Sequence, residues 1–304
     1  MKKVVVLMSA YNGEKYIEVQ IDSILKQKGV DIELVVRDDG SKDSTLSLLR
    51  SYNDSRIKVI EGSNCGCSAS FFSLLKYVHE NYDNNVFFAF SDQDDYWLDD
   101  KLCTAVSYLE TFDSTTPNLY ISNLYIVDGE LNNPQPFYSK TINLSKQHAL
   151  IQNHATGCTM VFNKPAIDSI LSKDTSAFRI HDIPMFLQCL FLGNVYFDDS
   201  CHILYRQHQN NVIGAGFYFK QRIKSKINSI KNLKNQHLKE NDAKVFFTQF
   251  KNDLSKEDTE IFMTVMNYRS NIKYRIKLLC SNQYQKSGFV DNFFFKLRVV
   301  LGHV

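Results

Sequence analysis

The feature that most constrains the fold is a series of short apolar segments separated by segments of helical spacing. Residues 4–8, 32–36, 57–60 and 86–90 are rich in Val, Ile and Phe, the composition expected of strands buried on both faces. Between the first two, apolar residues recur at three- and four-residue spacing across residues 17–25 and predict a helix. This alternation predicts a parallel sheet with right-handed crossover connections.

The pattern continues less regularly, and glycine nearly vanishes after residue 217. We therefore divide the chain into an α/β domain of residues 1–216 and a helical region of residues 217–304. Residues 132–136 are expected to form an exposed loop. Further helices are expected at residues 46–49, 71–79, 101–110 and 184–192, and further strands at residues 119–127, 159–162, 195–197 and 202–205.

The bulk composition is that of an ordinary globular protein, with 44% hydrophobic and 22% charged residues and a net charge of +2. The seven cysteines have no repeated spacing, and Cys65 and Cys67 stand too close together for a CxxC pair, so we expect reduced thiols. We see no secretory signal and no stretch of about 20 apolar residues. These features predict a cytoplasmic protein, at most attached to the inner face of the cell membrane.

Polar and aromatic residues follow three of the predicted strands at the point where each strand ends. Tyr11 follows the first strand, Asp38 and Asp39 follow the second, and an acidic run at residues 92–95 follows the fourth. Ligands bind beyond the carboxyl ends of the strands in an open α/β sheet. We therefore expect a ligand site at this edge.

The acidic run offers two carboxylates, Asp92 and Asp94, separated by one residue in a loop. Such carboxylates repel each other, and a divalent cation such as Mg²⁺ or Mn²⁺ relieves the repulsion. The cation would bind a diphosphate and neutralise its charge as it leaves. Short acidic triplets also occur by chance, and the alternative is a solvated turn in which Asp95 caps the next helix.

The acidic pair after the second strand has a functional and a structural interpretation. A carboxylate there can accept a hydrogen bond from the imide N–H of uracil or thymine, and Tyr11 can lie against the base. In the structural alternative, residues 38–41 are a turn followed by a helix cap, and Tyr11 belongs to the core.

At these positions the chain resembles glycosyltransferase family 2, whose fold is called GT-A. Residues 9–12 (Ser-Ala-Tyr-Asn), 38–41 (Asp-Asp-Gly-Ser) and 92–95 (Asp-Gln-Asp-Asp) are similar to its successive nucleotide and metal motifs. The resemblance spans about residues 1–215 and implies a Rossmann-like mixed sheet flanked by helices, with a helical C-terminal region. The narrower resemblance to a bacterial rhamnosyltransferase branch is carried by residues 91–97, 100–102, 156–160, 181–182 and 205–208.

The resemblance implies a role for each matching residue in binding the donor. Ala10, Tyr11 and Asp39 would bind the nucleotide, with Asp39 on the base. Asp92 would reach the ribose or the metal, and Asp94 would be the main metal ligand. The implied cofactor is Mg²⁺ or Mn²⁺.

The resemblance also implies which residues surround the leaving group and the acceptor. Asp182 matches the base that deprotonates the acceptor hydroxyl. His208, with Arg206 nearby, would lie against the diphosphate or the metal. Three further residues are assigned to the diphosphate or acceptor region, namely Trp97, Gly157 and Cys158.

Some of these residues have structural alternatives. Asp182 is also suited to be a helix N-cap ahead of Pro184. For His181 we favour packing or hydrogen bonding over direct catalysis. His208 is balanced between a ligand and a structural role.

The implied reaction is inverting transfer from a nucleotide-diphosphate sugar to a hydroxyl of a cell-surface polysaccharide or lipid-linked glycan. Resemblance alone favours dTDP-L-rhamnose as the donor, and a UDP-hexose is the alternative. The QxxRW-type motif of the processive branch is not seen, which favours transfer of one or a few sugar residues. Two other classes of protein are alternatives. A sugar nucleotidyltransferase would be expected to carry a Gly-rich basic phosphate loop, which residues 9–13 lack. A catalytically silent nucleotide-binding scaffold would not need Asp182.

The C-terminal region combines basic and apolar residues. Residues 219–238 carry an apolar stripe at helical spacing between Lys and Arg side chains, and residues 293–295 are three consecutive Phe. Such helices can lie on an anionic membrane. For residues 219–238 we favour a helix that packs on the main domain and exposes its basic face to solvent. Nucleic acid is not expected as a partner, because no recognition module accompanies the charge.

Overall fold

The structure of the chain is a computed structural model that describes residues 1–207 and 237–304. The chain divides into two compact units, which we call the sheet unit and the helical unit. The predicted domain boundary after residue 216 lies outside the described residues and stays a prediction. The sheet unit comprises residues 1–141 and 155–208, and the helical unit comprises residues 142–154 and 209–304.

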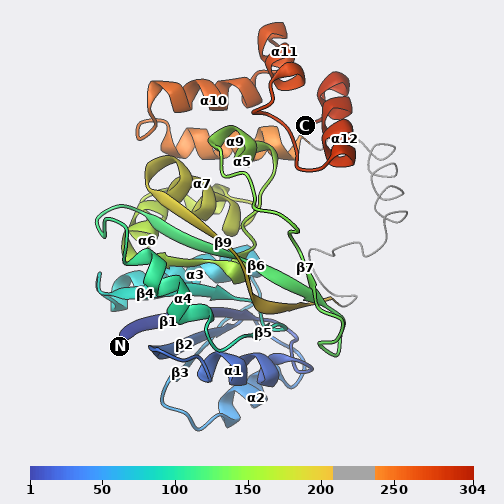
Figure 1. Cartoon of the computed structure of the whole chain (residues 1–304). Helices are drawn as coiled ribbons and strands as arrows, with labels where there is room; N and C mark the ends of the chain where they lie inside the picture. The colour runs from blue at the N-terminus through green and yellow to red at the C-terminus, as the bar shows by residue number, and fades with distance from the viewer. Residues whose placement is uncertain (208–236) are drawn as a thin grey trace. The chain divides into compact units, whose positions relative to one another are not determined.

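Within the described residues, the sheet unit contains one sheet of nine strands (Figure 1). The order is β3-β2-β1-β4-β8-β6-β9-β5, and β7 pairs with β6 outside this path. The strands are β1 (Lys2–Ala10), β2 (Val30–Asp38), β3 (Ile57–Glu61), β4 (Val86–Ser91), β5 (Tyr96–Trp97), β6 (Asn118–Val127), β7 (Gln135–Pro136), β8 (Val161–Asn163) and β9 (Asn194–Arg206).

The sheet is mixed, which confirms the expected fold class. β1, β2, β3 and β4 are mutually parallel neighbours, β8 runs antiparallel to both β4 and β6, and β9 is parallel to β6. In β1, all five residues from 4 to 8 are fully buried, as their unbroken apolar sequence predicts for the interior of a parallel sheet.

Three segments differ from the expectation. The two short strands expected at residues 195–197 and 202–205 are one strand, β9, whose pairing with β6 shifts register between Ser122 and Tyr125. The two-residue strands β5 and β7 were not expected. β7 lies within the predicted loop at residues 132–136. Such two-residue strands depend on a partner strand, so a local pattern does not indicate them.

Helices cover both faces of the sheet. Val4, Val6 and Met8 pack in one core with α1 and α4, and the alternate residues of β1 face the opposite side, where α3 lies. The helices of the sheet unit are α1 (Ile17–Leu25), α2 (Thr45–Ser51), α3 (Cys67–Asn81), α4 (Lys101–Leu109), α6 (Lys164–Leu171) and α7 (Asp182–Leu192), with 3₁₀ turns at η1 (Gly157–Thr159) and η2 (Thr175–Ala177).

The described part of the helical unit is α-helical, as expected for the C-terminal region. Its interior contains a fully buried carboxylate, Glu240, which accepts hydrogen bonds from Arg269 and Lys244. Within the described residues, no helix is long and apolar enough to span a bilayer. The predicted basic helix at residues 219–238 lies almost entirely outside the described residues. The helices are α5 (Lys146–Ile151), α9 (Leu238–Phe250), α10 (Lys256–Met266), α11 (Ile272–Cys280) and α12 (Phe289–Leu301).

Candidate active site

The carboxyl ends of β1, β2 and β4 lie side by side at one edge of the sheet. In the parallel register, Ala10 is opposite Asp38, and Met8 is opposite Ser91. The backbone N–H of Asp39 donates to the carbonyl of Ala10 at 2.7 Å. The loops that follow these strands are therefore neighbours in space.

Gln93 joins the loop after β4 to the loop after β1. The Tyr11 N–H donates to Oε1 of Gln93 at 2.9 Å, and Nε2 of Gln93 donates to the Tyr11 carbonyl at 3.0 Å. A Cβ at Gly13 would lie 2.3 Å from Oε1 of Gln93, so a side chain there would displace this amide. The two loops are thus held together by one side chain.

Asp39 is a buried carboxylate with a dense set of donors. Arg37 forms an ion pair with it, and the backbone N–H groups of Cys65 and Gly66 donate to its two oxygens, each at 2.9 Å. Burial opposes ionisation, but these hydrogen bonds outweigh it and hold the pKa of Asp39 below its ordinary value. Asp39 is therefore an anion at neutral pH.

Asp38 serves the turn that follows β2. One of its oxygens accepts hydrogen bonds from the N–H groups of Gly40 and Ser41, at 3.2 and 3.1 Å. Gly40 has a φ of +75°, where a side chain would be strained, and its place against the backbone of Asn64 leaves no room for one. The turn interpretation of this motif therefore applies to Asp38 rather than to Asp39.

The acidic run after β4 concentrates negative charge. Asp92 is half-buried, and burial, followed by the charges of Asp94 and Asp182, raises its pKa to about 7. Asp95 is fully buried and accepts a hydrogen bond from the Arg206 N–H at 3.2 Å. The side chain of Asp95 thus supports β9 and does not cap α4, whose N-cap residue is Asp100.

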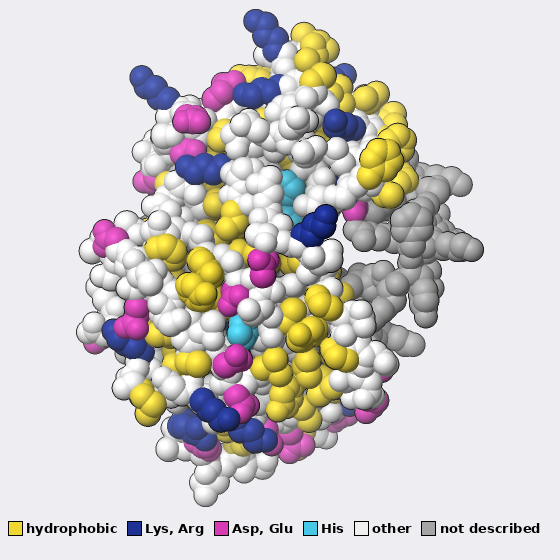
Figure 2. Space-filling model, viewed as in Figure 1, with side chains coloured by type: hydrophobic (Ala, Val, Ile, Leu, Met, Phe, Trp, Pro, Cys, Tyr) yellow, Lys and Arg dark blue, Asp and Glu magenta, His cyan; other side chains and the backbone are white. Residues whose placement is uncertain are grey.

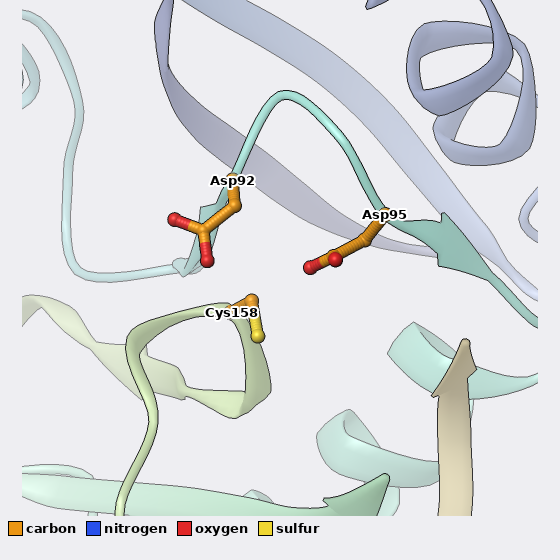
Figure 3. Close-up of side chains that lie close together, drawn as sticks. All are labelled: Asp92, Asp95 and Cys158. Atoms are coloured by element: carbon orange, nitrogen blue, oxygen red, sulfur yellow. The ribbon is translucent and has the colours of Figure 1, made fainter. Parts of the chain in front are cut away.

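Asp92, Asp95 and Cys158 form a compact group, with one ligand atom of each within 4.8 Å of the others (Figure 3). The three side chains reach this group from the end of β4, the start of β5 and the η1 turn. Burial, and then the charges of Asp95 and Asp92, raise the pKa of the Cys158 thiol well above its ordinary value. The thiol is therefore a neutral donor beside the two carboxylates.

Asp182 is the first residue of α7 and is only 4% exposed. A Cβ on Gly157 would lie 3.0 Å from Nε2 of His181 and 3.9 Å from Cβ of Asp182, so the η1 turn lies directly against the start of α7. His181 is stacked on Phe71 at 3.9 Å between ring centroids, and burial lowers its pKa to about 3. The packing role favoured for His181 agrees with this environment.

The thiol of Cys67 lies in the electric field of several acids. Cys67 is exposed at the start of α3. Partial burial, and then the charges of Asp92, Asp182, Asp39 and Asp94, raise the pKa of this thiol to about 12. Four acids that are as far as 143 positions apart, from Asp39 to Asp182, therefore act on one atom at the sheet edge.

Comparison with known proteins identifies the family and the fold of the chain. The profile of the family described as Glycosyl transferase family 2 matches residues 5–171, more than half of the chain. The protein named dTDP-rhamnosyl transferase RfbG, from Shigella flexneri, is 34% identical over 232 residues, covering 71% of this chain and 77% of that protein. This chain belongs to glycosyl transferase family 2.

A second family relative is the Escherichia coli protein named UDP-Glc:alpha-D-GlcNAc-diphosphoundecaprenol beta-1,3-glucosyltransferase WfaP. It is 31% identical to this family 2 chain over 138 residues, covering 44% of the chain and 53% of WfaP. Among solved structures, residues 1–349 of S. aureus TarS in complex with UDP align with a TM-score of 0.56 and 17% identity, covering 99% of this chain and 92% of TarS 1–349. The likeness to TarS concerns the fold, which is GT-A.

Two assigned residues of this family 2 chain, Arg206 and Trp97, have environments that the motifs do not indicate. The guanidinium of Arg206 is buried, donates to the carbonyls of Asp94 and Gly129, and lies 4.5 Å from the Tyr16 ring centroid. Trp97 is 0% exposed, so its side chain has no exposed surface for the predicted contact with the diphosphate or the acceptor. His208 lies outside the described residues.

The motifs also missed residues that organise the edge. Gln93 contacts Tyr11, Cys65 contacts Asp39, and Cys67 follows Gly66, which donates to Asp39, but the sequence gave none of the three a role. Gln93 stands inside the acidic run, which is the one signal that could have indicated it. Cys65 and Cys67 stand out in the sequence only as too close together for a CxxC pair. That spacing does not indicate their place beside Asp39, because folding alone brings a thiol near a carboxylate.

Proposed function

We propose that this family 2 enzyme transfers L-rhamnose from dTDP-L-rhamnose, with inversion, to a hydroxyl of a cell-surface polysaccharide or lipid-linked glycan. The observation that carries the proposal is that the acids after β2 and β4 and the start of α7 meet at one edge of the sheet. Asp92 groups with Cys158 of the η1 turn, and a Cβ on Gly157 of the same turn would lie 3.9 Å from Cβ of Asp182. Transfer requires an acid that binds the base, ligands for a cation that neutralises the diphosphate, and a proton acceptor, all at one place, and these acids supply candidates for each role.

Asp39 would bind the base of the nucleotide. Its lowered pKa keeps it ionised, and its Oδ2 accepts from the Gly66 N–H while retaining a further lone pair. That lone pair would accept the imide N–H of thymine or uracil. Ala10 and the loop at Tyr11 adjoin Asp39 through the 2.7 Å backbone hydrogen bond, which supports their place beside the base.

Asp182 would be the proton acceptor. In the reaction, the acceptor oxygen bonds to the anomeric carbon as the bond from that carbon to the diphosphate oxygen breaks, and the acceptor proton passes to Asp182. Displacement in one step inverts the anomeric centre. The position of Asp182 in the first turn of α7, against Gly157, would hold its carboxylate in place during the step. Gly157 and Cys158 would border the acceptor.

The acidic cluster is suited to a divalent cation. Asp92 and Asp94 would hold Mg²⁺ or Mn²⁺, because a cation would relieve the repulsion between the two carboxylates. Asp95 and Cys158 fit less well as ligands, because Asp95 is fully buried and accepts from the Arg206 N–H, and because a sulfur donor is too soft for these cations. When bound, the cation would supply positive charge to the leaving diphosphate.

The donor can be identified by thermal shift. We expect dTDP-L-rhamnose with Mn²⁺ to raise the melting temperature more than UDP-glucose, dTDP or UDP under the same conditions, because a ligand stabilises the folded state by mass action. The similarity to RfbG over 71% of the chain supports this choice. A larger shift with UDP-glucose would favour a UDP-hexose donor, the alternative that WfaP supports. Absence of any shift with all four would contradict the proposed donor site.

Asp182→Asn tests the catalytic assignment. Loss of the proton acceptor should reduce turnover about 10³-fold and leave the donor-induced thermal shift unchanged. The matched control is Asp168→Asn, at a half-exposed position on α6 whose carboxylate pairs with Lys164. Equal turnover in the two variants would refute the assignment.

A further inference from the structure

The exposed apolar residues of the chain are unevenly distributed. Eleven large hydrophobic side chains are exposed in the described residues, and six of them belong to α11 and α12. Figure 2 shows apolar side chains gathered over these two helices, with Lys and Arg side chains nearby. The six residues are Ile272, Ile276, Phe289, Phe293, Val300 and Leu301.

In α12, the exposed residues share one face of the helix. Phe289, Phe293 and Val300 are spaced by four and seven residues, which places them on one side, and they are 88%, 57% and 57% exposed. The opposite side packs into the helical unit through Phe295 and Val299, which are buried. This helix therefore has two apolar faces, and only one of them is covered.

α11 repeats the arrangement and lies next to α12. Ile272 and Ile276, one turn apart, are 65% and 52% exposed, whereas Leu278 on the other side is fully buried. We call the exposed faces of α11 and α12 together the apolar patch. A patch of this kind on a folded domain indicates a surface that another structure covers.

The charges around the apolar patch are mainly positive. Residues 272–301 contain six basic residues and one acidic residue. Helical spacing places Lys296 on the same face as Phe289 and Phe293, while Asp291 lies on the other side of α12. The six basic residues are Lys273, Arg275, Lys277, Lys286, Lys296 and Arg298.

We propose that the apolar patch binds the surface of an anionic lipid bilayer, with Phe289 and Phe293 inserted at the headgroup level. An apolar helix face bordered by Lys and Arg is complementary to acyl chains beneath negative headgroups. A second copy of this chain fits the patch less well, because each copy would bring the same excess of positive charge to the interface. The proposal concerns attachment and does not depend on which sugar the enzyme transfers.

The proposal is tested by flotation of the full chain with vesicles. We expect binding to vesicles containing phosphatidylglycerol, weak binding to pure phosphatidylcholine, and loss of binding at high salt. The double variant Phe289→Ser, Phe293→Ser should lower the partition coefficient by at least about tenfold. The matched control is Val19→Ser, which replaces a side chain that is 40% exposed on α1.

Charge reversal separates the electrostatic attraction to anionic headgroups from the insertion of apolar side chains. Lys273→Glu with Lys296→Glu should abolish the preference for anionic vesicles, whereas Lys76→Glu, at an exposed position of α3, should not. Donor-induced thermal shifts should be the same in all variants, which shows that they fold. Equal flotation of the Phe double variant and the unsubstituted chain would overturn the proposal, as would a concentration-dependent dimer in light scattering that this variant abolishes.

Discussion

The acids at the sheet edge share a residue type and differ in their surroundings. Asp38 is occupied by its own turn, and Asp95 is buried beneath β9. Asp39 is kept ionised by Arg37 and two backbone donors, whereas burial, followed by the charges of its acidic neighbours, raises the pKa of Asp92 to about 7. Burial and hydrogen-bond partners, rather than residue type, therefore distinguish the acids suited to a ligand from those that support the fold.

Gln93→Ala should raise the KM for the donor about tenfold with a smaller effect on kcat. The variant removes both hydrogen bonds to the Tyr11 backbone and so frees the loop after β1. Gln93→Glu keeps an acceptor for the Tyr11 N–H but loses the donor to its carbonyl, and it should be intermediate. Steady-state kinetics measures both constants, and Gln135→Ala, at an exposed position of β7, is the control. If the donor KM of Gln93→Ala stays within twofold of that of the unsubstituted chain, Gln93 does not position the loop after β1.

At the scale of elements, the site depends on how helices are joined to strands. α7 carries Asp182 at its start and passes into β9 through Gly193. The N–H of the next residue, Asn194, donates to the carbonyl of Pro117 at 3.0 Å, so the joint lies directly on the chain before β6. The close backbone approach explains why glycine stands between these two elements.

Gly193→Ala should reduce the free energy of unfolding by about 2 kcal/mol or more. The added Cβ would lie 1.8 Å from the Pro117 carbonyl oxygen, so the backbone of α7 or β6 must move. Urea denaturation measures the change. Gly129→Ala is the control, because its Cβ would have no atom nearer than 3.9 Å, and equal stability of the two variants would contradict the packing argument.

At the scale of the whole molecule, the active site costs stability. A carboxyl group whose pKa is raised on folding binds more protons in the folded state, so the stability of the protein falls as pH rises from about 4, the ordinary pKa of Asp, to about 7, the folded pKa of Asp92. Above that range no further stability is lost through this group. Burial of Asp92 beside other acids thus lowers the stability of the folded protein at neutral pH.

Asp92→Asn should therefore stabilise the metal-free protein at pH 8 while it abolishes transfer. The amide removes a negative charge that faces Asp94 and Asp182. At pH 4, where Asp92 is protonated in the folded protein, the gain should disappear. Melting temperatures of the variant and the unsubstituted chain, recorded with EDTA at the two pH values, measure this gain in stability. If Asp92→Asn is less stable than the unsubstituted chain at pH 8, repulsion between Asp92 and its acidic neighbours does not destabilise the fold.

The sequence by itself determined the order of the central elements and the edge at which the acids gather. The reason is local: unbroken apolar runs indicate buried strands, three- and four-residue spacing indicates helices, and parallel strands place their carboxyl ends together. The tertiary structure alone decided that β8 lies antiparallel between β4 and β6, that β9 is one strand, and that Trp97 is buried. It also brought Gln93 and Cys67 to the acids, because these contacts join residues far apart in the chain and leave no periodic trace in it.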